Sequence, residues 1–171
     1  MSDQNPYSAP DAALATANSD TYNPSIFSFS GRIGRLRYLA YSFGVSLILM
    51  GVMMPLVGVS AMMDPTAGMS GLSLIAYIVL NIASIVITIM FGKRRLNDLN
   101  RSAWYLLLFI VPLVNLFFII YIIFFSGTDG ENKYGLQASP NTMGVKILAL
   151  FMPVLFFVGI AAAIIIPAMQ V

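Results

Sequence analysis

The side chains that could do chemistry are few in this sequence, and most of them are basic. Of 171 residues, 9 are Lys or Arg and 7 are Asp or Glu, while His and Cys are both absent. Without His the commonest catalytic base and metal ligand are missing, and without Cys there is no disulfide or thiolate. An enzyme would have to use Asp98, Asp129 or Glu131, and no arrangement of other residues supports that. We therefore expect no catalytic residues, no metal site and no cofactor.

Most of the basic residues lie beside long apolar stretches. Seven of the nine fall within residues 32–37 and 93–101. Such residues keep their side of a span in the cytoplasm and attract anionic headgroups, which also explains the net charge of +2 without nucleic acid. We predict anionic membrane lipids as partners, and we expect the following residues to contact their headgroups: Arg32, Arg35, Arg37, Lys93, Arg94, Arg95 and Arg101. Asp98 is expected to form only an exposed pair with Arg94 or Arg101.

The composition indicates a membrane protein. Hydrophobic residues make up 58% of the chain, charged residues 9%, and the mean hydropathy is +0.85. Soluble domains are about a quarter charged, so a soluble protein is excluded. A span needs about 20 apolar residues. The sequence predicts an all-α integral membrane protein with about four apolar helical segments, near residues 38–62, 71–91, 104–125 and 146–169.

The third apolar segment, residues 104–125, allows two arrangements. Pro112 removes a helix hydrogen bond and Asn115 could cap a restarted helix, so this is one kinked span or a re-entrant hairpin of two short halves. The usual length of a span favours the first arrangement. Charge favours the second, because Lys133 and Lys146 would then share a side with the other basic residues. The kinked span is the preferred prediction.

The flanking residues divide the chain into three parts. Residues 1–25 are polar, with three Asp and no basic residue, and predict a disordered cytoplasmic tail. Residues 26–135 form the multi-span domain, and residues 136–171 add a loop and a last transmembrane helix. The domain begins with a predicted amphipathic helix in the headgroup region at residues 26–37. Residues 64–68 predict a turn on the far side, and residues 126–144 a solvated connection.

Two patterns lie within the predicted spans. A column of small residues, seven apart, lets a neighbouring helix approach closely: Gly44, Gly51 and Gly58. A stripe of polar residues shares one face of the second span: Ser73, Tyr77, Asn81, Ser84 and Thr88. Lipid cannot satisfy these side chains, so we expect them to face the bundle or a hydrated cavity. Hydrogen bonding between helices is the preferred interpretation, and a path for an uncharged solute is the alternative.

Three segments carry a resemblance. Residues 27–38 (FSFSGRIGRLRY), 93–104 (KRRLNDLNRSAW) and 127–135 (GTDGENKYG) together resemble a bacterial inner-membrane family, domain of unknown function 805. The resemblance implies a small multi-span plasma-membrane protein with no established activity. Residues 159–169 are similar to the N-terminal helix of type IV pilins, although the acidic residue upstream is missing.

These observations predict a non-enzymatic protein of the bacterial inner membrane with a cytoplasmic N-terminus. It would act by helix packing, lipid contact, or association with itself or other membrane proteins. The alternative is a component of a transporter or channel for an uncharged solute. Ion or proton transport is less compatible with the sequence, because no predicted span contains a charged residue apart from Lys146 at the start of the last one.

Overall fold

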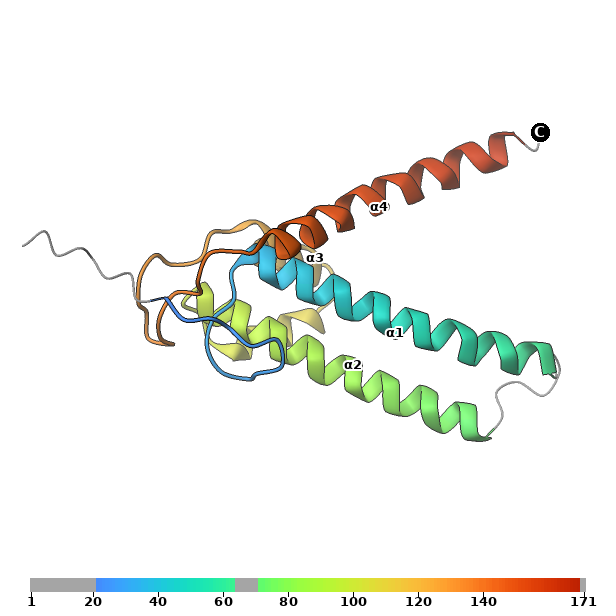
Figure 1. The fold of residues 1–171 in the computed structure, drawn as a ribbon, viewed down its shortest axis with the longest axis horizontal. Coiled ribbons are helices and arrows are strands. Elements are labelled where there is room, and N and C mark those ends of the chain that lie inside the picture. Colours follow the sequence, from blue (N-terminus) through green and yellow to red (C-terminus); the bar gives the residue numbers. More distant parts are fainter. Residues whose placement is uncertain (1–20, 64–70, 170–171) are drawn as a thin grey trace, which may run out of the picture.

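The computed structural model describes residues 21–63 and 71–169, and the long elements of this part are helices (Figure 1). Their order along the chain is α1 (Arg35–Met63), α2 (Gly71–Asp98), the 3-10 helix η1 (Ala103–Phe109), α3 (Val114–Phe124) and α4 (Met143–Ala168). In the described part, α1, α2 and α4 are long and apolar enough to cross a membrane. The prediction of an all-α membrane protein is confirmed.

The three long helices begin or end at the same end of the molecule. Helices α1 and α2 run side by side in opposite directions, and α4 starts near the first turns of α1 and then diverges from it (Figure 1). Helix α2 has 28 residues and is therefore about 42 Å long, against about 30 Å for a hydrocarbon core. A helix of this length, crossing along the membrane normal, has several residues outside the hydrocarbon core. The predicted tail at residues 1–20 and the turn at residues 64–68 lie outside the described residues.

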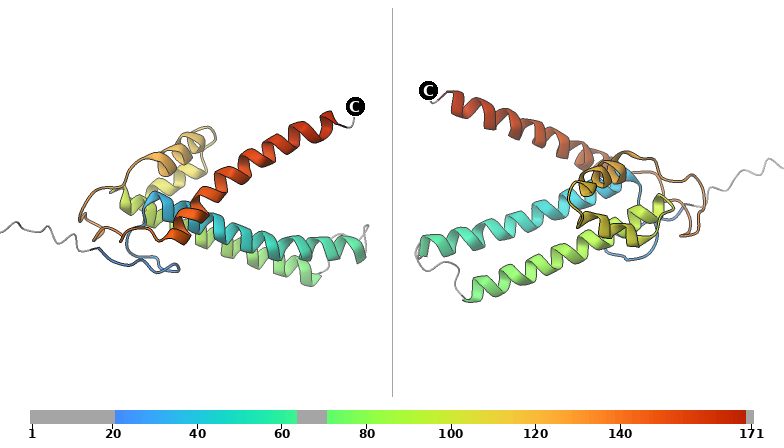
Figure 2. Two further views of the ribbon diagram at one scale, coloured as in Figure 1. Left: turned by 45° about the horizontal axis from the view of Figure 1, so that its top comes forward. Right: turned by 180° about the vertical axis from the view of Figure 1, so that it is seen from behind.

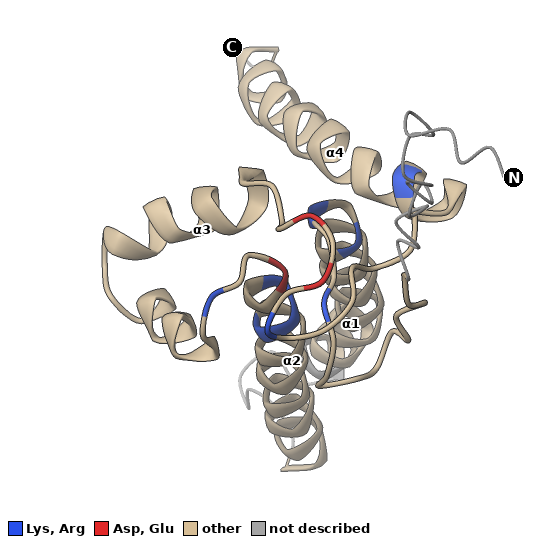
Figure 3. Ribbon diagram, turned by 90° about the vertical axis from the view of Figure 1, so that its left-hand side faces the viewer, with Lys and Arg blue, Asp and Glu red and all other residues tan. Residues whose placement is uncertain are grey.

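The third apolar segment is broken into two short helices, so the preferred prediction of a kinked span is wrong. Helix α3 has 11 residues and is about 16 Å long, half the thickness of a hydrocarbon core. Leu113 has φ 65°, and the Val114 N–H donates to the Pro112 carbonyl at 2.8 Å, which forms a γ-turn. The helix cannot continue through this turn. Helices η1 and α3 fold back on each other beside α2 (Figures 2 and 3), as the hairpin alternative requires.

The predicted amphipathic helix at residues 26–37 is also wrong, because α1 begins only at Arg35. The preceding chain turns at Gly31, where φ is +80°, a conformation that suits glycine. It then lies against the end of α2, where the Ile33 N–H donates to the Arg94 carbonyl at 3.2 Å. Ile33 is fully buried there. The segment before Arg35 therefore packs against α2 and does not form the predicted helix.

The end of the predicted tail is ordered. The Tyr22 N–H donates to the Gln137 carbonyl at 3.1 Å, and the Ser139 N–H donates to the Tyr22 carbonyl at 2.9 Å. Pro24 is buried. The predicted disordered tail therefore cannot extend as far as residue 25, because residues 21–25 are held against the loop before α4.

The buried side chains gather at the end of the molecule where α2 finishes. One apolar cluster joins α2 to the hairpin and consists of Leu96, Leu99, Phe118 and Ile122. A second joins the segment before α1 to α2 and consists of Ile33, Met90 and Phe91. Most apolar side chains in the rest of the long helices are exposed, as expected of surfaces that face lipid. This end therefore holds the part of the fold that is packed like a domain.

Candidate functional site

The candidate site is built on the last turns of α2. The helix ends in a Schellman motif, in which the Arg101 N–H donates to the Leu96 carbonyl at 2.8 Å and the Asn100 N–H to the Asn97 carbonyl at 3.1 Å. Asn100 has φ 56°, which asparagine tolerates better than most residues. This firm end fixes the positions of Arg94, Arg95 and Asp98. Every Lys, Arg, Asp and Glu of the described residues lies at this end of the molecule (Figure 3).

Asp98 lies between two arginines. Its Oδ1 is 3.2 Å from Arg32 NH2, and its Oδ2 is 2.7 Å from Arg95 NH1. Both arginine side chains are fully buried and the Asp98 side chain is 6% exposed. In the described part of the chain these two are the ion pairs. A buried charge is stable only when it is paired and hydrogen-bonded, so each member of this network depends on the others.

Arg32 binds the loop that follows α3. Its NH1 donates to the Gly130 carbonyl at 2.6 Å and to the Gly135 carbonyl at 3.1 Å, and its NH2 donates to the carbonyl and hydroxyl of Thr128. Thr128 also donates from its backbone N–H to the Asp98 carbonyl at 2.9 Å. The expected solvated connection at residues 126–144 is therefore wrong for its first half, because Arg32 holds that half against α2.

The two other arginines of α2 bind different segments. Arg95 donates from Nε to the Ile122 carbonyl at 2.8 Å and from NH2 to the Phe125 carbonyl, which fixes the end of α3. Arg94 donates from NH1 to the Ser25 carbonyl at 2.8 Å and to the Ile26 carbonyl at 3.1 Å. We call Arg32, Arg94, Arg95 and Asp98 together the arginine network. It joins the N-terminal segment, α2, the hairpin and the following loop.

The loop passes directly over Asp98 at Gly127. A Cβ atom at this position would collide with the Asp98 carboxylate. Asn132 completes the contact by donating from Nδ2 to the Asn97 carbonyl at 2.9 Å and to the Thr128 hydroxyl at 2.7 Å. The close approach of loop and helix thus requires glycine at position 127.

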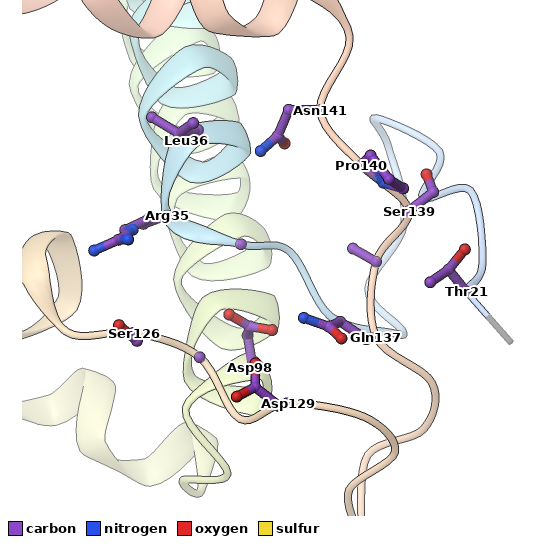
Figure 4. Close-up of a pocket in the computed structure, with 13 residues that line it drawn as sticks. Thr21, Arg35, Leu36, Asp98, Ser126, Asp129, Gln137, Ser139, Pro140 and Asn141 are labelled. Atoms are coloured by element: carbon purple, nitrogen blue, oxygen red, sulfur yellow. The ribbon is translucent and has the colours of Figure 1, made fainter. Parts of the chain in front are cut away.

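A polar cavity of about 460 Å³ lies between the first turn of α1 and this loop (Figure 4). Asp98 forms part of its lining, together with Arg35 from α1 and Asp129 from the loop. Its hydroxyl and amide groups come from Thr21, Ser126, Gln137, Ser139 and Asn141. The cavity can therefore offer charges of both signs as well as neutral donors and acceptors.

The structure separates the seven basic residues predicted to contact headgroups. Arg32, Arg37, Arg94 and Arg95 are buried, and Arg37 donates from NH2 to the Ser139 hydroxyl at 3.1 Å and to the Pro140 carbonyl at 3.0 Å. These four would have to leave their present positions to bind a headgroup. Arg35 and Arg101 are exposed and Lys93 is half-buried. A hydrogen bond with Tyr121 raises the pKa of the Arg101 guanidinium. Arginine is charged at neutral pH even without such a bond.

The expected pairing of Asp98 was wrong in partner and in environment. Its partners are Arg95, three residues earlier, and Arg32, which is 66 positions away. Helical spacing also allows the pair of Arg95 and Asp98, but the expectation named Arg94 and Arg101. The sequence signal that could have found the true network is the set of three resembling segments. One contains Arg32, the next contains Arg95 and Asp98, and the last contains Thr128.

The polar stripe of α2 is satisfied mostly within its own helix. Asn81 Nδ2 donates to the Tyr77 carbonyl at 2.9 Å, Ser84 Oγ to the Asn81 carbonyl at 2.7 Å, and Thr88 Oγ1 to the Ser84 carbonyl at 2.8 Å. Tyr77 and Thr88 are exposed. Asn81, Ser84 and Thr88 line small cavities between α2 and α1. Backbone carbonyls of α2 accept their protons, so these bonds lie within one helix and do not join two helices. Ser73 is buried.

The glycine column contacts another helix at one position. A Cβ atom at Gly44 would lie 3.1 Å from Leu148 of α4, whereas nothing lies within 4 Å of such an atom at Gly51 or Gly58. Helix α4 diverges from α1 beyond its first turns, which explains the difference (Figure 1). Close packing through Gly51 and Gly58 is therefore not found within the described part of the chain.

Fold and site together define an integral membrane protein whose long helices meet at one end in a buried arginine network. The chain belongs to the family described as protein of unknown function (DUF805), whose profile matches residues 26–136. The matched residues include the whole arginine network. The likeness of residues 159–169 to pilin helices lies outside the match and stays a prediction.

Two curated relatives are both called inner membrane protein YhaH, one from Escherichia coli strain K12 and one from Escherichia coli O157:H7. Each is 48% identical to this chain over 42 residues. The match covers 25% of this chain and 35% of the relative, so the chain spans about a third of the relatives' length. No solved structure matches the chain.

Proposed function

We propose that this protein is a non-enzymatic component of the bacterial inner membrane that contacts lipid headgroups through the end of the molecule carrying the arginine network. The observation that carries the proposal is the arrangement of charge and apolar surface there. The network holds a hairpin half the thickness of the hydrocarbon core beside exposed basic residues. A short apolar hairpin bordered by cations is suited to one leaflet and its headgroups.

The surface of the hairpin supports this placement. Trp104 is 79% exposed and lies just after the basic segment, where an indole ring suits the membrane boundary. The turn between η1 and α3 exposes apolar side chains, with Ile110 at 77% and Leu113 at 78%. The hairpin therefore presents an apolar tip and a polar base, which matches the gradient from hydrocarbon to headgroups.

The proposal places this end in the cytoplasm. Basic residues near the ends of spans stay on the cytoplasmic side. The hairpin returns to the side from which it starts, so residues 21–34, 99–102 and 126–142 all share this side. Three crossings then place the end of α4 on the opposite side of the membrane. The exposed surface of α4 is available for association with a second copy or with another membrane protein.

Single cysteines test this topology directly, because the natural sequence contains none. We expect cysteines at Asn100 and Asp129 to resist an impermeant thiol reagent in intact spheroplasts. A cysteine at Met62, at the far end of α1 and 86% exposed, should react. Labelling at Asp129 with protection at Asn100 would show that the hairpin crosses the membrane and would overturn the proposal. Lysed cells provide the control for reactivity at each position.

Lipid retention in native mass spectrometry tests the headgroup contact. The protein purified in mild detergent should retain phosphatidylglycerol or cardiolipin. Replacing Lys93 and Arg101 with Gln should reduce this retention more than replacing Lys133 and Lys146, which are both exposed and serve as the matched pair. Equal loss of lipid in the two double variants would mean that Lys93 and Arg101 determine the topology and do not bind headgroups. Arg94 and Arg95 are unsuitable for this test, because their replacement would disturb the fold.

The non-enzymatic part of the proposal is supported by the absence of His and Cys and by the use of both Asp98 oxygens in ion pairs. The alternative, passage of an uncharged solute along the polar stripe, has less support. One N–H of Asn81 and the hydroxyl protons of Ser84 and Thr88 are donated to carbonyls of α2, which leaves fewer donors for a solute.

A further inference from the structure

The polar cavity beside α1 has the size and position of a headgroup site. Its volume of about 460 Å³ falls within the range of small-ligand sites, about 300 to 1,000 Å³. The first turn of α1 forms one wall through Gly34, Arg35 and Leu36. Because α1 enters the membrane from this turn, the cavity lies at the boundary where lipid headgroups are found.

The cavity contains opposite charges that do not neutralise each other. Arg35 donates from NH1 to the Phe124 carbonyl at 3.3 Å, and in the described part of the chain neither Arg35 nor Asp129 forms an ion pair. The two side chains stand apart on different sides of the cavity (Figure 4). A simple anion would meet the carboxylate of Asp129, and a simple cation would meet the guanidinium of Arg35. A ligand that carries both charges, separated by a short link, would satisfy both residues.

The position of Asp129 is fixed before any ligand binds. Arg32 donates to the carbonyls of Thr128 and Gly130, the residues on either side of Asp129. Hydrogen bonds between Tyr22 and residues 137–139 hold the opposite wall. A preformed site avoids the entropy cost of ordering a loop on binding. The arginine network therefore gives the cavity a stable shape.

We propose that this cavity binds the phosphoethanolamine headgroup of a membrane phospholipid, with the phosphate toward Arg35 and the ammonium toward Asp129. Arginine is suited to the phosphate because its planar guanidinium can bind two oxygens at once. Ser126, Gln137 and Asn141 also line the cavity and supply neutral hydrogen-bonding groups. The inference rests on the proposed function, because it assumes that this end of the molecule meets headgroups, and it assigns one headgroup class to one cavity.

Native mass spectrometry of the full chain, given equal amounts of phosphatidylethanolamine and phosphatidylglycerol, tests the inference. The unmodified protein should retain phosphatidylethanolamine preferentially at one site. Asp129→Asn should reduce that retention about fivefold, the factor that corresponds to the upper value for an exposed ion pair. Glu131→Gln is the matched control, because Glu131 is an exposed acid of the same loop that does not line the cavity. It should change nothing.

Arg35→Gln should weaken retention of both lipids at this site, because both contain the phosphate, whereas Lys133→Gln should have no effect. Equal loss in Asp129→Asn and Glu131→Gln, or no preference in the unmodified protein, would overturn the inference. Glycerophosphoethanolamine, which lacks acyl chains, should displace the lipid only when present in large excess. Displacement at an equal concentration would assign the cavity to a soluble ligand and overturn the lipid assignment. The proposed function has its own test. It fails if replacing Lys93 and Arg101 with Gln leaves the retention of phosphatidylglycerol unchanged.

Discussion

The two halves of α2 both carry polar side chains, and they obtain their hydrogen bonds in different ways. In the half that lies at membrane depth, Asn81 and Thr88 donate to carbonyls of their own helix. In the last turns, Arg94 and Arg95 donate to carbonyls 27 to 69 positions away in the sequence. A side chain satisfied by its own helix adds no constraint between segments. The arginines at the end of α2 instead determine how the remaining segments are arranged.

The difference follows from the surroundings of each half. Lipid offers no hydrogen-bond partners, so a short polar side chain in a span is satisfied most easily by the preceding turn. At the end of α2 the neighbouring segments are irregular, and their backbone carbonyls need donors. A long guanidinium with five N–H groups can serve several such carbonyls at once. The arginines therefore act as internal donors for loops, which is a different role from contact with headgroups.

Replacing Asp98 should give the largest effect on stability. Asp98→Asn leaves two buried guanidiniums without their shared counter-charge, and breaking a buried ion pair costs about 3 to 5 kcal/mol. The free energy of unfolding can be measured by circular dichroism during SDS titration in mild-detergent micelles. A loss below about 1 kcal/mol, the value for exposed pairs, would show that the network does not hold this end of the molecule together.

Arg32 and Arg35 form a matched pair on the same segment, and we expect their replacement by Gln to differ strongly. Arg32→Gln removes donors from Thr128, Gly130 and Gly135 as well as an ion pair, so it should destabilise the protein by about 3 kcal/mol or more. Arg35 is exposed, and Arg35→Gln should cost less than about 1 kcal/mol. The same SDS titration compares the two variants. Similar losses in the free energy of unfolding would mean that buried Arg32 contributes no more to stability than exposed Arg35.

The sequence predicted the long helices well and the arginine network poorly, for a physical reason. Span length and hydropathy are local properties, so α1, α2 and α4 could be located from the residues they contain. The network depends on contacts between distant segments, such as that of Arg32 with Asp98, and helical spacing cannot reveal these. The same limit explains the helix expected at residues 26–37, because the spacing of apolar residues there says nothing of their contact with α2.

The hairpin shows what local signals can and cannot decide. Pro112 and Asn115 correctly marked the interruption, and both arrangements of residues 104–125 followed from them. The choice depended on whether Arg95 would bind the carbonyls of Ile122 and Phe125, which brings the end of α3 back to α2. Length statistics favoured a span, whereas charge distribution favoured the hairpin. The charge argument was the better guide because it concerns the whole chain.

Adding a methyl group at Gly127 should have an intermediate effect. Gly127→Ala places a Cβ atom against the Asp98 carboxylate, so the loop must move away from the network. Inserting a methyl group into a well-packed site costs about 1 to 3 kcal/mol. Gly144→Ala is the control, because nothing lies within 4 Å of a Cβ atom there, and it should be neutral or slightly stabilising. A neutral result at Gly127 would show that the loop is free to shift without disturbing Asp98.

Replacing Asn81 should give the smallest effect and is the sharpest test of the other half of α2. Asn81→Leu removes a hydrogen bond to the Tyr77 carbonyl within the same helix, and the Leu side chain suits the apolar surroundings. Hydrogen bonds between membrane helices average about 0.6 kcal/mol, and we expect a bond within one helix to contribute no more than that. The SDS titration should therefore show a change in the free energy of unfolding below that value.

Proteoliposomes containing the unmodified protein and the variant should have equal permeability to small uncharged solutes. Solute flux that requires Asn81, in a variant of unchanged stability, would show that the stripe serves transport and that its bonds within α2 open during passage.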